Sequence, residues 1–123
     1  MLRLNWAKIG AALGFLSVAL GAFGAHILKT MLTDDLVGVF ETAVQYQFFH
    51  ALALVFVGVL QKQFPEKNFD FAGLAFLVGV VLFSMSLYLL ALTGVKWLGA
   101  VTPFGGVSFL AGWAIMFLQI PKR

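Results

Sequence analysis

The chain has 123 residues, of which 62% are hydrophobic and 11% are charged. Soluble domains carry about 25% charged residues, so a water-soluble fold of this size could not bury so much apolar surface. The formal net charge is +3, but the basic residues are dispersed over loops and termini, which argues against nucleic-acid binding. The chain contains no cysteine, which excludes disulfides and thiolate sites.

Four apolar stretches are long enough to cross a hydrocarbon core, which takes about 20 residues. We expect membrane spans at about 9–28, 36–60, 71–92 and 98–120. The sequence therefore predicts an all-α integral membrane four-helix bundle, formed by one domain over residues 1–123. The first stretch also resembles a secretory signal peptide, with its cationic start, apolar run and small residues.

The first span carries a seam of small residues at helical spacing. Its members are Ala7, Gly10, Gly14, Ser17, Gly21 and Gly24. Small seams let helix backbones approach closely in lipid, where the hydrophobic drive between helices is weak. We expect this seam to pack against a helix of the same chain or of a second copy. Gly105, Ser108 and Gly112 in the fourth span form a weaker seam and are a plausible partner within the chain.

The second span follows Thr33, a good N-cap residue with two acids in the next turn. Its first part contains Glu41, Gln45 and Gln47, so we expect that part to lie in the membrane interface or to stand above it. His50 lies deeper. In the fourth stretch, Thr102 followed by proline predicts that the regular helix begins there, after an irregular segment.

Basic residues indicate the orientation of the spans. With four spans, both termini and the central loop share one side, which carries 6 of the 8 Lys and Arg residues. Lys29 and Lys96 are the 2 on the other side. The positive-inside rule therefore predicts that both termini are cytoplasmic.

Polar side chains gather toward the predicted extracytoplasmic half. The candidate polar site comprises His26, Glu41, Gln45, Tyr46, Gln47, His50, Ser84, Ser86, Tyr88 and Thr102. Polar groups at membrane depth need partners. The natural partners are Glu41 for His26, across the short turn, and Tyr46 and Gln47 for His50, one helical turn away. Alternatively, His26 hydrogen-bonds carbonyls at the end of its own helix, and a carbonyl satisfies His50. A role in fixing the packing is the commoner use of such histidines.

A metal or proton site built from His26, Glu41 and His50 is the alternative interpretation, since zinc and iron bind these residue types. The spacing, however, contains neither HxxxH nor ExxH, and no GxSxG or phosphate-binding loop is present. We therefore expect no metal, no cofactor and no catalytic residues.

Four motifs together resemble a known family. They are "GAFGAHILK", "FETAVQYQFFHALAL", "LFSMSLYLLALTG" and "LGAVTPFGGVSFLAGW". They are similar to the bacterial inner-membrane family called domain of unknown function 423, itself similar to eukaryotic transmembrane protein 256. The resemblance implies a small four-helix membrane protein of the bacterial inner membrane, and it supplies no activity. In the family's third motif a glycine separates the two serines, where this chain has Met85.

The sequence thus favours a non-enzymatic structural or interaction protein that contacts the lipid bilayer and either a second copy or another membrane protein. The alternative is a transporter, or a membrane protein that binds a small ligand or ion at His26, Glu41 and His50. An enzyme acting on lipid or quinone is a third and weaker possibility.

Overall fold

A computed structural model describes residues 4–122, except the side chain of residue 25. Within that range the chain is helical and contains no strand. Four helical segments are long and apolar enough to cross a membrane. The predicted all-α membrane fold with four spans is confirmed.

The first span is not one regular helix. It consists of α1 (Trp6–Ala19), a π-helical segment η1 (Leu20–Gly24) and a short α2 (Ala25–Leu28). The side chain of Asn5 caps α1 by accepting a hydrogen bond from the backbone N–H of Lys8. A π segment makes one wider turn and shifts the residues after it around the helix axis. The sequence did not predict this π-helical segment or the shift that it causes in the helix face.

The second span is the single helix α3 (Asp34–Gln63). Thr33 is its N-cap, as predicted, and its hydroxyl accepts a hydrogen bond from the Leu36 N–H at 3.3 Å. At 1.5 Å per residue, the 30 residues of α3 are about 45 Å long, more than the hydrocarbon core of about 30 Å. Its ends therefore reach the interfacial regions.

The third span is also interrupted by a π-helical segment. It consists of α4 (Asp70–Gly79), η2 (Val80–Met85) and α5 (Ser86–Thr93). Gly94 ends α5 with a φ of 72°, a left-handed conformation that suits glycine because it lacks a Cβ. The chain then turns back toward the last span.

The fourth span begins with a 3₁₀ segment, η3 (Lys96–Ala100), followed by α6 (Thr102–Gln119). The regular helix therefore starts at Thr102, after an irregular segment, as the Thr-Pro pair predicted. The N-cap, however, is Val101 rather than Thr102. Thr102 is already helical, and its hydroxyl is close to Ser86 instead of capping the helix.

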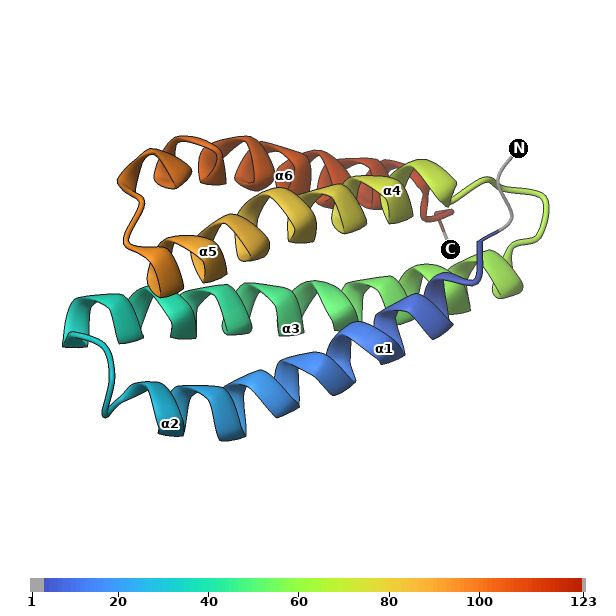
Figure 1. Cartoon of the computed structure of the whole chain (residues 1–123). Coiled ribbons are helices and arrows are strands. Elements are labelled where there is room, and N and C mark those ends of the chain that lie inside the picture. Colours follow the sequence, from blue (N-terminus) through green and yellow to red (C-terminus); the bar gives the residue numbers. More distant parts are fainter. Residues whose placement is uncertain (1–3, 123) are drawn as a thin grey trace.

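Helix α3 lies at the centre of the molecule, with α1 on one side and the α4–η2–α5 segment on the other (Figure 1). Helix α6 packs against α4 and η2. The start of α1, the end of α6 and the turn 64–69 lie at one end, called the terminal end here (Figure 1). The opposite end, called the distal end, carries the turns 29–33 and 94–101.

The small seam of the first span faces α3. A Cβ on Gly10 would lie 2.5 Å from the Ala51 carbonyl oxygen, and one on Gly21 would lie 3.1 Å from Val44. Gly24 lies against the ring of Phe40 in the same way. The partner of the seam is therefore a helix of the same chain.

The suggested pairing of the first span with the fourth is wrong. Gly105 packs against the backbone of Phe83 in η2, and Gly112 packs against the ring of Phe76 in α4. The small residues of α6 thus accept bulky groups of the third span. Because the seam of α1 packs on α3 and that of α6 packs on α4 and η2, the two seams do not meet.

Candidate functional site

The side chain of Gln47 is fully buried between three helical segments. Its Nε2 donates to the carbonyl oxygen of Leu13 in α1 at 3.0 Å. Its Oε1 accepts a 2.6 Å hydrogen bond from the Tyr88 hydroxyl in α5. Because a backbone carbonyl only accepts, these two contacts fix the orientation of the amide. Gln47 therefore connects α1, α3 and α5 at membrane depth.

Two serines of the third span extend this polar connection. Ser84 in η2 is fully buried and donates to the Ala43 carbonyl oxygen of α3 at 2.8 Å. Ser86 lies 2.6 Å from the Thr102 hydroxyl at the start of α6. In α1, Ser17 is buried and donates to the same Leu13 carbonyl that Gln47 uses. Every span therefore takes part in these contacts.

The Tyr88 hydroxyl is expected to contribute measurably to stability. Tyr88→Phe leaves the buried Gln47 Oε1 without its donor, so we expect a loss of about 1 kcal/mol in the free energy of unfolding, the size of membrane-buried hydrogen bonds. Tyr46→Phe is the matched control, because its hydroxyl makes no hydrogen bond within residues 4–122. Circular dichroism during SDS titration measures both variants. Equal losses would contradict the role of the hydroxyl.

His50 lies in an aromatic surround at the middle of α3. Its ring stacks on Phe109 with centroids 3.6 Å apart and planes inclined by 8°. Its Nδ1 lies 2.7 Å from the Tyr46 carbonyl oxygen, and its Nε2 lies 3.0 Å from the indole nitrogen of Trp113. The expected partner Tyr46 is thus present through its backbone, whereas Gln47 bonds elsewhere.

These contacts define one protonation form of His50. The Trp113 indole N–H can only donate, so Nε2 accepts and Nδ1 carries the hydrogen that the Tyr46 carbonyl receives. We expect ¹⁵N spectra of labelled protein to show a neutral imidazole protonated at Nδ1. In Trp113→Phe, we expect the fraction protonated at Nε2 to rise, because Nε2 loses its donor. A spectrum dominated by the Nε2-protonated form in the wild type would contradict the geometry.

The rest of the candidate polar site lies on the surface. His26, Glu41, Gln45 and Tyr46 are exposed, and Tyr46 makes only ring contacts, one of them with Phe83 at 4.6 Å between centroids. The predicted pairing of His26 with Glu41 is not made, and within residues 4–122 neither side chain has a hydrogen-bond or ion-pair partner. Both point outward, where water or lipid headgroups can solvate them.

A second polar cluster, at the terminal end, was missed by the sequence reasoning. The indole of Trp6 donates to Asp70 Oδ1 at 2.8 Å, and both residues are buried. A tryptophan near the end of a span is typically an anchor in the membrane interface. Instead Trp6 packs over Gly73, so close that a Cβ there would lie 2.5 Å from the ring.

Two buried oxygen atoms of this cluster have no hydrogen-bond partner among the described residues, Asp70 Oδ2 and Gln119 Oε1. The amide nitrogen of Gln119 donates to the Asn68 carbonyl oxygen at 2.8 Å. Gln61 accepts from the backbone N–H of Phe69 at 2.9 Å and so closes the turn before α4. The only sign of this cluster in the sequence is Asp70, an acid beside apolar residues at the start of a span. An acid at such a position is equally typical of a loop.

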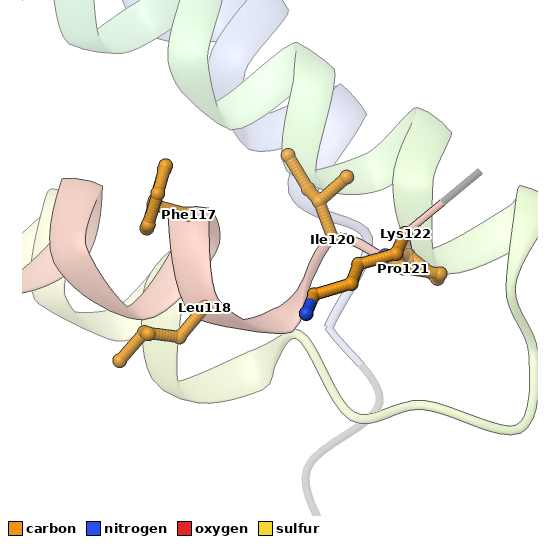
Figure 2. Close-up of a pocket in the computed structure, with 5 residues that line it drawn as sticks. All are labelled: Phe117, Leu118, Ile120, Pro121 and Lys122. Carbon is orange, nitrogen blue, oxygen red and sulfur yellow. The ribbon is translucent and has the colours of Figure 1, made fainter.

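A surface hollow of about 390 Å³ lies at the end of α6 (Figure 2). It is lined by Phe117, Leu118, Ile120, Pro121 and Lys122. It offers one ammonium group among apolar side chains. Apart from Lys122, these residues carry no ionisable or hydroxyl side chain, and the arrangement suits a lysine at the membrane surface.

The arrangement does not collect the residues of a metal site. His50 is buried beside α6, whereas His26 and Glu41 lie on the surface toward the distal end. Within the described part of the chain, no three His, Cys, Asp or Glu residues lie close enough to hold a metal ion. The buried polar groups can connect helices, and the exposed ones can contact lipid or a partner.

Comparison with known proteins identifies the family. The family model for a protein of unknown function, DUF423, matches residues 20–106. UPF0382 membrane protein SH2409 of Staphylococcus haemolyticus is 46% identical over 114 residues, which cover 93% of each chain. UPF0382 inner membrane protein YgdD of Escherichia coli K12 is 45% identical over 105 residues, which cover 85% of this chain and 80% of that protein. No solved structure matches the chain. The localisation expected from the sequence agrees with these names, and the chain belongs to the DUF423 family of small multi-pass membrane proteins.

Proposed function

We propose that this protein is a non-enzymatic accessory protein of the inner membrane, whose exposed helix faces contact lipid and a second copy or another membrane protein. The supporting observation is the pairing of the buried polar groups around Gln47 and His50. Each of their side-chain nitrogen and oxygen atoms has a partner within residues 4–122. A fully paired network holds helices in place and leaves no group free to bind a substrate.

The exposed face of α6 is the first place to look for a partner. Leu110 is 70% exposed and Phe117 is 80% exposed, whereas Phe76 in α4 is fully buried. Large apolar side chains on a membrane helix contact either lipid or protein. The proposal therefore predicts that the exposed face of α6 contacts a protein in native membranes.

Photo-crosslinking in intact membranes tests this proposal. A benzophenone amino acid at Leu110 or Phe117 is expected to give a crosslinked product of defined mass, and one at Phe76 is expected to give none. The products are identified by mass spectrometry as a second copy or another membrane protein. A protein that is strictly monomeric and uncrosslinked, yet shows transport or catalysis in liposomes, would refute the accessory role.

We also propose that the terminal end faces the cytoplasm. The two termini and the central loop share one side of the membrane, and that side carries 6 of the 8 basic residues. The chain has no cysteine, so single cysteines can report its orientation. We expect Lys29→Cys to react with a membrane-impermeant maleimide from outside intact cells, and Lys122→Cys to react only after lysis. The reverse labelling pattern would overturn this orientation.

A further inference from the structure

Three adjacent hollows form one groove on the surface between the first span and α3. Their volumes are about 490, 300 and 230 Å³. The first two share Val18 and Phe48, and the second and third share Gly21, Val44 and Gln45. The hollows are therefore continuous from Ala11 in α1 to Glu41 in α3. We call this feature the lateral groove.

The chemistry of the lateral groove changes along its length. The hollow that extends nearest to the terminal end is apolar, and its lining includes Ala11, Phe15 and Phe48. Toward the distal end, the groove reaches the amide of Gln45 and then the carboxylate of Glu41. Neither polar side chain has a hydrogen-bond or ion-pair partner among residues 4–122. Polar groups at a lipid-facing surface need such partners.

The depth of these groups follows from the length of α3. If the helix is centred in the bilayer, its excess of about 15 Å is divided between the two ends, so about five residues lie outside the hydrocarbon at each end. Glu41 then lies near the boundary with the headgroups. Gln45 lies one helical turn deeper, about 6 Å along the axis. From the headgroup level toward the bilayer centre, the groove thus presents the Glu41 carboxylate, then the Gln45 amide, and then an apolar surface.

We propose that the lateral groove binds a phospholipid with a primary ammonium headgroup. Its ammonium donates to the Glu41 carboxylate, an ester carbonyl accepts from the Gln45 amide, and an acyl chain lies along Val18 toward Ala11. The order of groups along the groove matches the order of groups along such a lipid. This inference rests on the proposed function only in treating the groove as a lipid-facing surface.

A helix from a second copy fits the groove less well. The backbone N–H and C=O groups of a membrane helix are bonded within that helix, so its apolar face would cover Gln45 and Glu41 without offering partners. A lipid presents both an acceptor and a cationic donor at one end. Charge complementarity with Glu41 therefore favours the lipid.

Native mass spectrometry of the full chain tests the inference. The protein is reconstituted in nanodiscs containing equimolar dioleoyl phosphatidylethanolamine, phosphatidylcholine and phosphatidylglycerol, then released, and the retained lipids are counted. We expect the wild type to retain phosphatidylethanolamine over phosphatidylcholine by about fivefold, the ratio that corresponds to about 1 kcal/mol for a partly exposed ion pair. Phosphatidylcholine has the same chains, but its quaternary ammonium has no N–H to donate.

Two variants and their matched controls locate the binding. Glu41→Gln is expected to abolish the preference for phosphatidylethanolamine, and Ala22→Phe, which fills the groove, is expected to lower the retention of all three lipids. Glu66→Gln, an exposed acid in the turn 64–69, and Ala114→Phe, an exposed position on α6, are expected to behave as wild type. Circular dichroism checks that each variant is folded.

Three results would overturn the lipid site. They are equal retention of the three lipids by the wild type, an unchanged preference in Glu41→Gln, and a dimer that excludes lipid and is lost in Ala22→Phe. The last result would assign the groove to a second copy. If the preference for phosphatidylethanolamine is absent but the α6 crosslinks form, the lipid site alone is rejected. If the crosslinks do not form but the preference is present, only the proposed partner contacts are rejected.

Discussion

Gly10→Ala is expected to lower the free energy of unfolding by about 2 kcal/mol, the middle of the range for overpacked sites. The new Cβ would lie 2.5 Å from the Ala51 carbonyl oxygen and 2.8 Å from the Val55 nitrogen. These are backbone atoms of α3, so they cannot rotate away, and α1 must move outward. That movement would also lengthen the Gln47 hydrogen bond to the Leu13 carbonyl. SDS titration followed by circular dichroism measures the loss.

Gly14→Ala is the matched control, because it makes the same substitution one turn further along α1. Its Cβ would meet only the Ala51 Cβ, at 3.9 Å, which is ordinary van der Waals contact. Alanine also favours the helix by up to about 1 kcal/mol relative to glycine. We therefore expect Gly14→Ala to be neutral or stabilising. If Gly10→Ala were equally well tolerated, the close approach of α1 to α3 would be wrong.

Trp6→Phe is expected to destabilise the protein by about 3 kcal/mol, the upper part of the range for a buried charged group that loses its partner. Phenylalanine keeps an aromatic ring over Gly73 but removes the indole N–H that donates to Asp70 Oδ1. The other carboxylate oxygen already lacks a partner among residues 4–122. Circular dichroism in SDS titration is the appropriate measurement, because the substitution removes one of the 3 tryptophans that report by fluorescence.

Asp70→Asn separates the charge of the carboxylate from the contact with Trp6. The asparagine oxygen can still accept from the indole, and a neutral amide replaces a buried carboxylate whose Oδ2 has no partner among the described residues, so we expect little loss in the wild-type background. In the Trp6→Phe background, we expect Asp70→Asn to recover part of the lost stability. If Asp70→Asn alone cost as much as Trp6→Phe, the carboxylate would be held by a cation that the described residues do not supply.

Local signals predicted much of the fold because they depend on short stretches of sequence. Thr33 caps α3, and the Thr-Pro pair at 102 marks the start of α6. The two π segments were not predictable, since "LGAFG" and "VVLFSM" have ordinary helical composition. Both segments lie against α3, a neighbour that no short stretch contains.

The candidate polar site was only partly predictable for a similar reason. The sequence placed Gln47, Tyr88 and His50 in one group, but it could not show that Gln47 connects Leu13 with Tyr88. Trp113, which is the donor to His50, was not among the candidate residues. Partners 63 residues apart meet only after the helices pack.

The sequence by itself determined the membrane environment, the four spans and the family, because length, hydropathy and motifs are properties of the chain. It also determined that the first span has a face of small residues. Only the tertiary structure decided that this face packs on α3, that Asp70 is buried against Trp6, and that Glu41 and Gln45 lie together in a surface groove. The physical reason is that composition fixes the depth of a helix in the bilayer, whereas close contacts between helices fix which face is buried.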